Sequence, residues 1–166
     1  MSTIKIRPIE LNDNKALAAI IREVLVEMGV PKVGTAYEDK ALDMMYETYN
    51  ESRGAYFVVE CDGSVLGGAG IAPLENGEED VCELQKMYVS SKMRGKGVGR
   101  QLMEICLSKA KEEGFESCYL ETMPYMESAK KLYGKVGFEP LEKPMGDTGH
   151  YNCLLYTSDA ADECHS

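Results

Sequence analysis

Residues 94–100 of this chain have the sequence RGKGVGR, which places three glycines and three basic side chains in seven positions. Immediately before them, residues 82–89 (CELQKMYV) are rich in strand formers. Immediately after them, residues 101–113 repeat apolar side chains at helical spacing. A glycine-rich turn between a strand and a helix presents unpaired backbone N–H groups and the positive end of the helix dipole to an anion. The stretch therefore predicts an α/β fold organised around a phosphate-binding turn.

Two common phosphate-binding loops do not fit this spacing. A P-loop needs G-x-x-x-x-G-K-[ST], and no lysine followed by serine or threonine stands in the required place. A dinucleotide fingerprint needs G-x-G-x-x-G, but its last position would be Arg100 or Leu102. The pattern that fits is R-x-x-G-x-G, from Arg94 to Gly99.

The composition is that of one globular domain, with 166 residues of which 44% are hydrophobic and 28% charged. No apolar run approaches the ~20 residues that a membrane-spanning helix needs, and the first ten residues lack the apolar stretch of a signal peptide. We therefore expect a cytoplasmic protein that does not bind a membrane. Four of the six cysteines fall within expected strands or a helix, which favours buried thiols over disulfides.

The formal net charge of −10 argues against a nucleic-acid partner, because duplex binders need a basic face and no basic stripe occurs outside residues 94–100. The same charge suits an anionic cofactor at that basic turn and a cationic co-substrate elsewhere. It is equally compatible with a surface that is acidic only for solubility.

The apolar periodicity and the turn residues predict the order β-α-α-β-β-β-α-β-α-β-β, an α/β domain with a mixed sheet. The expected strands are 3–9, 55–61, 64–73, 82–89, 117–123, 138–141 and 150–156, and the expected helices are 13–28, 37–49, 101–113 and 127–136. Asp62-Gly63 predicts a tight hairpin turn. Gly67, Gly68 and Gly70 predict a bulge or a close backbone approach in the next strand. The helix at 37–49 either carries an ordinary core stripe or borders a substrate pocket.

A second motif follows the first after one helix and one strand. Residues 128–138 (SAKKLYGKVGF) match A-x-x-L-Y-x-K-x-G-F, and Met87-Tyr88-Val89 ends the strand before the glycine turn. Together with R-x-x-G-x-G, these features resemble the GNAT superfamily of N-acyltransferases over about residues 3–152. The resemblance implies a single GNAT-like domain, with a mixed, mostly antiparallel sheet of six or seven strands and about four helices.

The resemblance also implies acetyl-CoA as the co-substrate and no metal. In the family, the strand splays away from its neighbour after the position of Met87, Tyr88 and Val89, and backbone groups there bind the pantetheine arm. The glycine turn holds the pyrophosphate, and its positions in this sequence are Arg94, Gly95, Lys96, Gly97, Val98, Gly99 and Arg100. One position departs from the family, since Met126 stands where many relatives have an asparagine that assists the cofactor.

Acyl transfer to an amine needs a base for the ammonium proton and an acid for the departing thiolate. Glu83 matches the position of the catalytic glutamate in the histone-acetylating branch of the family. Tyr133 matches the tyrosine that acts as general acid toward the CoA sulfur in many members. Period-two alternation would put Glu83 on the same face of its strand as Gln85, Met87 and Val89.

Each of these roles has a plainer alternative. Glu83 could be a surface carboxylate or act only through a water, with Glu121 as the rival base, and Tyr133 could be a packing aromatic. His150 is expected near the acceptor, or simply as a structural or solvated side chain. The cysteines are scattered along the chain, which favours direct transfer in a ternary complex over a covalent acyl-enzyme.

We therefore predict an N-acyltransferase that moves an acetyl group from acetyl-CoA to a primary amine on a small molecule or peptide. The residues that select the acceptor lie within 30–49 and 140–151, which carry no recognisable motif. The alternative is a non-catalytic acyl-CoA-binding module that senses the cofactor or regulates a partner. The sequence leaves open whether the protein is a homodimer.

Residues 153–163 (CLLYTSDAADE) resemble the translation of a transposase mosaic end joined to a library adapter. We therefore expect a domain at 1–152 followed by a non-native tail at 153–166. Residues 154–156 of that tail would pair as an edge strand in place of a different native one, and residues 159–166 would extend away from the domain.

Overall fold

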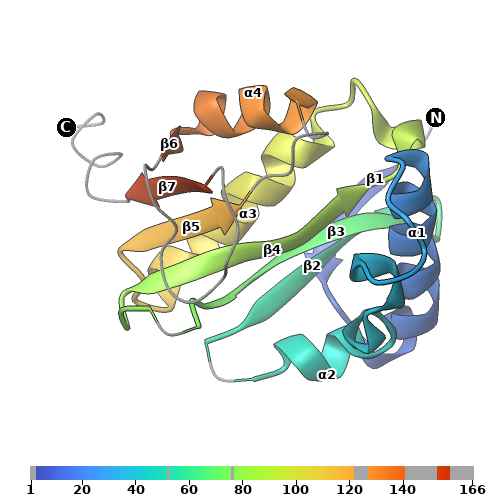
Figure 1. Ribbon diagram of the computed structural model, residues 1–166, viewed down its shortest axis with the longest axis horizontal. Coiled ribbons are helices and arrows are strands. Elements are labelled where there is room, and N and C mark those ends of the chain that lie inside the picture. Colours follow the sequence, from blue (N-terminus) through green and yellow to red (C-terminus); the bar gives the residue numbers. More distant parts are fainter. Residues whose placement is uncertain (1–2, 52, 76, 122–126, 141–152, 158–166) are drawn as a thin grey trace.

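A computed structural model describes residues 3–51, 53–75, 77–121, 127–140 and 153–157, with the side chains of 127–130 and 153–157 excepted. Its seven-stranded sheet has the order β1-β2-β3-β4-β5-β7-β6 (Figure 1). Among the described strands, β4 and β5 pair in parallel and all other neighbours are antiparallel. The strands are β1 (Ile4–Pro8), β2 (Ala55–Cys61), β3 (Ser64–Pro73), β4 (Val81–Val89), β5 (Ser117–Glu121), β6 (Glu139–Pro140) and β7 (Cys153–Thr157).

Four α-helices and four short 3-10 helices connect the strands in the described part of the chain. The α-helices are α1 (Asn14–Glu27), α2 (Met45–Tyr49), α3 (Val98–Glu112) and α4 (Glu127–Val136), and the 3-10 helices are η1 (Leu11–Asp13), η2 (Ala36–Glu38), η3 (Lys40–Met44) and η4 (Ser91–Met93). This order and the mostly antiparallel sheet confirm the predicted α/β fold. None of the described helices has the length and apolarity needed to cross a bilayer.

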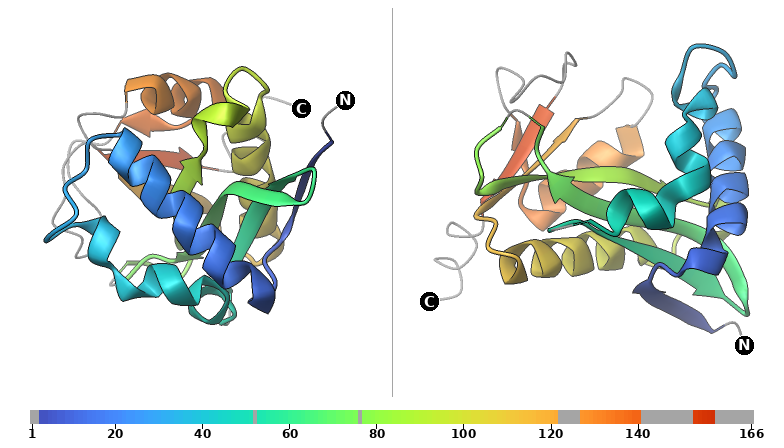
Figure 2. Two further views of the ribbon diagram at one scale, coloured as in Figure 1. Left: turned by 90° about the vertical axis from the view of Figure 1, so that its right-hand side faces the viewer. Right: turned by 90° about the horizontal axis from the view of Figure 1, so that it is seen from below.

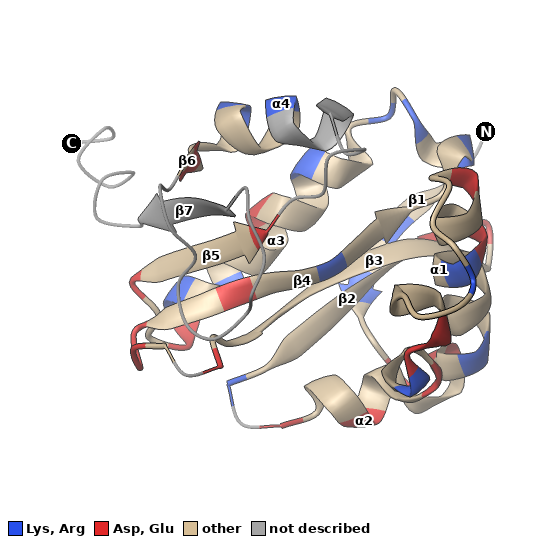
Figure 3. Ribbon diagram, viewed as in Figure 1, with Lys and Arg blue, Asp and Glu red and all other residues tan. Residues whose placement is uncertain are grey.

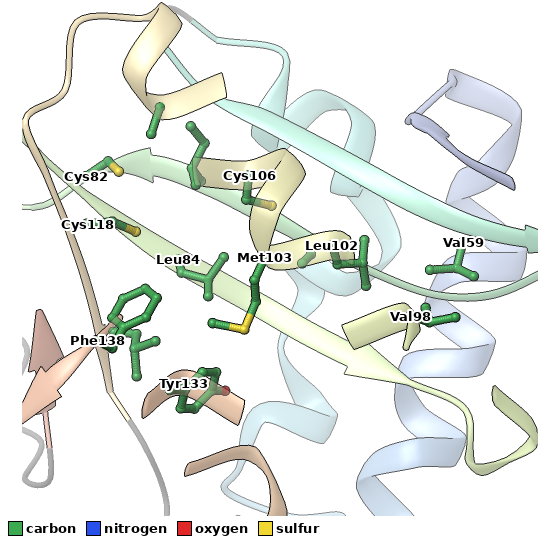
Figure 4. Packing of buried hydrophobic residues seen from close by; sticks show 14 of the residues in the cluster. Val59, Cys82, Leu84, Val98, Leu102, Met103, Cys106, Cys118, Tyr133 and Phe138 are labelled. Atoms are coloured by element: carbon green, nitrogen blue, oxygen red, sulfur yellow. The ribbon is translucent and has the colours of Figure 1, made fainter. Parts of the chain in front are cut away.

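The helices form two layers, one on each face of the sheet. Helices α1 and α2 cover one face, and α3, with α4 packed beside it, covers the other (Figure 2). The α3 core joins buried residues of α3 to sheet residues such as Val59 (Figure 4). The α1 core joins buried residues of α1 and α2 to Val58. Because Val58 and Val59 are consecutive, they point into different cores, as the alternation of a strand requires.

The β2–β3 hairpin has the tight turn predicted from its sequence. Asp62 and Gly63 have φ values of 51° and 87°, and they lie between the paired residues Cys61 and Ser64. Two consecutive positive φ values are typical of a type I′ turn, whose twist matches that of the flanking strands. The Asp-Gly pair therefore sets the register of the strands next to the turn, and the register then shifts by one residue between Glu60 and Val59.

The continuous helix predicted at 37–49 is wrong, because the backbone breaks at Asp39 and again at Met44, and side-chain caps start the first two pieces. Thr35 accepts a hydrogen bond from the backbone N–H of Tyr37 at 3.3 Å, and Asp39 accepts one from the backbone N–H of Ala41 at 2.9 Å. Asp39 itself is extended, with ψ of 116°, so the backbone leaves the helical conformation there and starts again. Short polar side chains at such positions favour caps over helix interiors. Only Met45–Tyr49 is α-helical.

A bulge interrupts the pairing of β3 with β4, as the glycines of β3 predict. Gly68 pairs with Tyr88 and Gly70 with Gln85, so that two residues of β4, Lys86 and Met87, lie opposite one residue of β3. Lys86 has φ of 47°, in the left-handed region that non-glycine residues rarely adopt.

The glycines allow this bulge because the ring of Tyr56 lies directly against them. A Cβ atom on Gly68 would lie 2.4 Å from Cε1 of that ring, and one on Gly70 would lie 2.5 Å from Cδ2. The Tyr56 hydroxyl then donates a hydrogen bond to the carbonyl of Lys86 at 2.7 Å. The flat glycine surface therefore lets one buried aromatic side chain support the bulged residue.

The extra residue changes which face each β4 side chain occupies. Before the bulge, Cys82 and Leu84 lie in the α3 core, and after it Met87 and Val89 pack against the same core. Gln85 instead contacts Tyr49 of α2. The prediction that Glu83 and Gln85 share a face with Met87 and Val89 is therefore wrong, because a bulge shifts the alternation by one residue.

β7 lies inside the sheet, between β5 and β6, so the prediction of an edge strand at 154–156 is wrong. β5 pairs with β4 over only three residues but with β7 over all five of its own, and β6 then pairs on the outer side of β7. β7 is thus the main partner of β5. The domain boundary at residue 152 stays a prediction, and residues 158–166 lie outside the described part.

Four cysteines are buried free thiols, which confirms the prediction for Cys61, Cys82, Cys106 and Cys118. Burial raises the pKa of Cys106 to about 12. The pKa of Cys118 is also raised, first by its hydrogen bond with Cys82 and then by burial. Such thiols are poor nucleophiles at neutral pH.

An ion pair fixes the start of the α1 layer to β1. Two guanidinium nitrogens of Arg7 donate to the two oxygens of Asp13, at 2.8 and 2.9 Å, and Asp13 also accepts from the backbone N–H of Glu10 at 2.7 Å. The side chains of Arg7 and Asp13 are 17% and 6% exposed. The hydrogen bond from Arg7 holds the pKa of Asp13 below its usual value.

Replacing Arg7→Met should lower the free energy of unfolding at pH 7 by about 2–3 kcal/mol, since a bidentate charged pair is broken and one carboxylate stays buried. The pKa of Asp13 is lower in the folded than in the unfolded protein, so this stabilisation is present above the unfolded value and is lost as pH falls through the folded one. The difference from wild type should therefore shrink below about pH 4. Urea unfolding at pH 7 and at acidic pH measures both effects.

Lys109→Met is the matched control, because it removes only solvent-accessible ion pairs at the end of α3, from Lys109 to Glu112 at 3.7 Å and to Glu113 at 3.3 Å. It should cost less than about 1 kcal/mol. Equal losses for the two variants, or a loss in Arg7→Met that does not depend on pH, would contradict the assignment.

Candidate active site

The glycine turn leads into α3 through two left-handed residues. Gly95 and Gly97 have φ values of 75° and 71°, and nothing lies within 4 Å of a Cβ atom built on either. Gly97 is the N-cap of α3, and no side chain caps the helix there. Helical pairing starts with the N–H of Gln101 bonded to the carbonyl of Gly97, so the three preceding N–H groups come before the first intrahelical bond. These groups and the helix dipole can hold an anion.

Gly99 has a different role, which is close packing. A Cβ atom at this position would lie 3.0 Å from Cδ2 of Leu132 and 3.3 Å from Cε of Met87. The absence of a side chain therefore lets α4 approach the first turn of α3. The second motif, at 128–138, is in this way brought against the first.

A cavity of about 710 Å³ lies at this junction. Its walls are the end of β4, the glycine turn, the start of α3, two residues of α4 and the end of α1. Ten of the sequence-predicted site residues line it: Met87, Tyr88, Val89, Arg94, Gly95, Gly97, Val98, Gly99, Arg100 and Tyr133. Lys96 is exposed on the turn without lining the cavity, and Glu83 lies outside it. Figure 3 shows the basic residues on the connection between β4 and α3.

The strands β4 and β5 separate beside this cavity. Their parallel pairing covers Val81 to Glu83 on β4, and beyond Glu83 the strand β4 continues to Val89 with no partner in β5. The implied splay is therefore present, but it begins after Glu83 rather than after Met87 to Val89. From Leu84 onward, the backbone of β4 that faces away from β3 is not used in pairing with β5, and an extended ligand can follow such an edge.

Tyr133 is a buried residue of α4 that lines the cavity. The residue is 4% exposed, and its ring packs edge-on against that of Phe138, with centroids 6.0 Å apart and an interplanar angle of 61° (Figure 4). Burial, with a smaller contribution from Tyr88, raises the pKa of Tyr133 to about 12. The hydroxyl therefore stays protonated at neutral pH and can donate a proton to a leaving group.

Glu83 lies on the α1 side of the sheet, held by neighbouring side chains. The amide nitrogen of Gln85 donates to Oε1 of Glu83 at 2.6 Å, and the hydroxyl of Tyr49 donates to the amide oxygen of Gln85 at 2.8 Å. Glu83 and Tyr133 thus belong to opposite faces of the sheet. Beyond Glu83, no pairing of β4 with β5 separates the two faces.

The rival carboxylate, Glu121, is also held by a side chain of its own strand. The hydroxyl of Tyr119 donates to Oε2 of Glu121 at 2.9 Å. Cys118 and Leu120 lie in the α3 core, so Tyr119 and Glu121 point to the α1 side, as Glu83 does. The geometry leaves both carboxylates as candidates for the base.

Some site features could not be found from the sequence. The end of α1 contributes Val24, Glu27 and Met28 to the cavity. The segment between β4 and the glycine turn contributes Ser90 and Ser91. The position of the two serines, between the strand and the glycine turn, could have identified them as site residues. No feature of the α1 sequence indicates that this helix borders the cavity. Met126 and His150 lie outside the described residues. Within those residues, no group of three or more His, Cys, Asp or Glu side chains could hold a metal ion.

Comparisons with known proteins agree with this geometry. The model of the acetyltransferase (GNAT) family matches residues 20–138. An uncharacterized N-acetyltransferase of Escherichia coli K12, YjgM, is 44% identical over 148 residues, which cover 89% of this chain and 89% of that protein.

Solved structures share the fold at low sequence identity. A GNAT acetyltransferase of Staphylococcus aureus Mu50 has a TM-score of 0.82 at 18% identity, covering 93% of this chain and 99% of that one. YncA of Salmonella typhimurium, solved with its cofactor acetyl-CoA, has a TM-score of 0.75 at 17% identity and covers 93% of both chains. The family match spans well over half of the sequence and the fold agrees over nearly all of it. The chain therefore belongs to the GNAT family of acetyltransferases.

Proposed function

We propose that this protein transfers the acetyl group of acetyl-CoA to a primary amine on a small molecule or peptide. The observation that carries the proposal is the cavity at the start of α3, where an uncapped helix N-terminus meets the part of β4 that does not pair with β5 and the buried side chain of Tyr133. The family match and the acetyl-CoA in the Salmonella structure support the choice of cofactor.

In this proposal each part of acetyl-CoA meets a group suited to its chemistry. The pyrophosphate accepts hydrogen bonds from the first N–H groups of α3, with Arg94 and Arg100 adding positive charge at the cavity wall. The pantetheine arm runs along β4 from Met87 to Val89 and forms strand-like hydrogen bonds with its backbone. The thioester then reaches the region where β4 and β5 diverge.

In the reaction the acceptor nitrogen loses two protons and the departing thiolate gains one. An alkylammonium ion has a pKa of about 10.4, so only about one molecule in a thousand is a neutral nucleophile at pH 7. Glu83, directly or through a water, removes the ammonium proton, and the amine attacks the thioester carbonyl. As the tetrahedral intermediate collapses and the C–S bond breaks, Tyr133 protonates the departing thiolate, and the second proton leaves the acceptor nitrogen and restores the phenol of Tyr133, directly or through water.

Direct transfer in a ternary complex is favoured over an acyl-enzyme. The thiols of Cys106 and Cys118 are buried and their pKa values are raised, so neither is a ready nucleophile. The net charge of −10 favours an acceptor that arrives as a cation.

Acetyl-CoA incubated with the protein should yield an acetylated amine. The panel is amino acids, a polyamine, an aminoglycoside and a peptide with a free N-terminus, beside hydroxyl and thiol acceptors, with products identified by mass spectrometry. A primary amine should turn over, because the proposed base and acid serve amine attack on a thioester. Calorimetry that shows tight acetyl-CoA binding, with no product from any acceptor, would instead favour a cofactor sensor.

The cofactor site is tested by Gly97→Asp, with Gly97→Asn as the matched control. Both side chains tolerate the φ of 71° better than most, and they differ mainly in charge. A carboxylate at the helix N-terminus would occupy the anion site and repel the pyrophosphate, so Kd for acetyl-CoA should rise at least about 100-fold, against less than about 10-fold for asparagine. Equal calorimetric affinities for the two variants would rule out this pyrophosphate position.

The acid–base roles are tested by Tyr133→Phe, Glu83→Gln and Glu121→Gln in steady-state kinetics. Tyr133→Phe should lower kcat by roughly 10–10³-fold with little change in acetyl-CoA affinity, since it removes one proton donor and keeps the ring. Glu83→Gln should lower the rate most at low pH, where few amines are already neutral.

Glu121→Gln tests the rival base, because Glu121 lies on the same face of the sheet as Glu83. Full activity in Tyr133→Phe would refute the proposed acid. A pH-dependent loss confined to Glu121→Gln would transfer the role of base to that residue, and ping-pong kinetics would exclude direct transfer.

A further inference from the structure

Two hydrogen bonds link three side chains in a row, from Tyr49 of α2 through Gln85 to Glu83. The hydroxyl of Tyr49 lies 2.8 Å from the amide oxygen of Gln85, and the amide nitrogen of Gln85 lies 2.6 Å from Oε1 of Glu83. Tyr49 is 3% exposed, so the first member of the chain is fixed inside the α1 core. Gln85 does not line the cofactor cavity.

The direction of both hydrogen bonds follows from the chemistry of the end group. An ionised carboxylate can only accept, so the nitrogen of the Gln85 amide must face Glu83. The amide oxygen then faces Tyr49, whose hydroxyl must donate. Burial, with a smaller contribution from the negative charge of Glu83, raises the pKa of Tyr49, so the phenol keeps its proton and remains a donor.

The chain is anchored at the point where β4 bulges. The ring of Tyr49 packs against that of Tyr56, with centroids 5.1 Å apart and an interplanar angle of 43°. Tyr56 in turn holds the carbonyl of Lys86, the residue after Gln85. Two neighbouring phenols therefore fix β4 here, one through its backbone and one through the amide of Gln85.

We propose that Gln85 is a positioning residue for Glu83, which turns the carboxylate toward the opening between β4 and β5 and holds it there as a proton acceptor. The proposal rests on the proposed function, because it gives Glu83 the role of base. Gln85 does not line the cofactor cavity, and in this proposal it acts through Glu83. Without its amide, the carboxylate would lose one hydrogen bond to its charged form and gain rotational freedom.

A test of Gln85 must leave the other charged groups on this face, and their ion pairs and hydrogen bonds, unchanged. Lys86 is ion-paired with Asp39 of the η3 cap at 3.1 Å, and Glu121 is bonded to Tyr119. Neither pair includes Gln85. Gln85→Met keeps the length of the side chain and removes both of its polar atoms, so it leaves these groups in place.

The first test needs no acceptor. In protein labelled with carbon-13 at the glutamate carboxyl carbons, NMR follows the titration of Glu83, whose signal is identified by its absence in Glu83→Gln. In Gln85→Met the titration midpoint of Glu83 should move to higher pH by about 0.5–1 unit, because a donor to the charged form is lost. Gln101→Met, the same exchange at an exposed position of α3, should leave the midpoint where it is.

The second test uses the amine with the highest turnover in the acceptor screen. Gln85→Met should lower kcat about 5- to 50-fold, move the acid limb of the pH profile to higher pH, and leave KM for acetyl-CoA unchanged. Tyr49→Phe should have a smaller effect of the same kind. In the Gln85→Met background, Tyr49→Phe should cause no further loss, because its hydroxyl acts only through the amide.

The outcomes separate the two proposals. If Glu83→Gln loses activity while Gln85→Met keeps the wild-type kcat and titration midpoint, the positioning role is wrong and the proposed function stands. If no acceptor turns over, or if the base is Glu121, both the role of Glu83 and the positioning role are overturned. Additive losses in the double variant would show that Tyr49 acts by another route and would overturn the three-residue chain.

Discussion

The hydrogen bond from the Tyr56 hydroxyl to the carbonyl of Lys86 sets the course of β4, and both halves of the site depend on that course. Lys86 has φ of 47°, a conformation that costs a non-glycine residue about 1–2 kcal/mol. The hydrogen bond returns about 1 kcal/mol, and the ion pair of Lys86 with Asp39 adds up to about 1 kcal/mol. The cost of the left-handed conformation and the gain from these two contacts nearly balance. The bulge therefore depends on the hydrogen bond from Tyr56, whose ring has room only because residues 68 and 70 are glycines.

Because of the bulge, the side chains at alternate positions of β4 face the α1 layer before it and the α3 layer after it. Before it, Glu83 and Gln85 face the α1 side, and after it Met87 and Val89 pack on the α3 core beside the glycine turn. A regular strand would have put all four side chains on one face. In the proposed function, the two reaction partners approach from opposite faces of the sheet and meet where β4 leaves β5.

Local chemistry made the motifs and turns predictable from the sequence, and contacts distant in the sequence decided the rest. Asp62-Gly63 carries its own turn preference, and the glycine turn lies between a clear strand and a clear helix. The face of Glu83 depends on a bulge that Tyr56, thirty residues from Lys86, helps to form. The hydrogen bond of Tyr49 to Gln85 spans thirty-six residues, and no periodicity in either segment marks it.

The place of β7 has a consequence for how the chain is made. β5 finds its full-length partner only in residues 153–157, which follow every other strand of the sheet. Until that segment has been synthesised, β5 presents an open edge of backbone N–H and C=O groups beyond its short contact with β4. A chain in which residues 153–157 are not yet paired with β5 is exposed to pairing with other chains at that edge, so docking of this segment protects the sheet from aggregation.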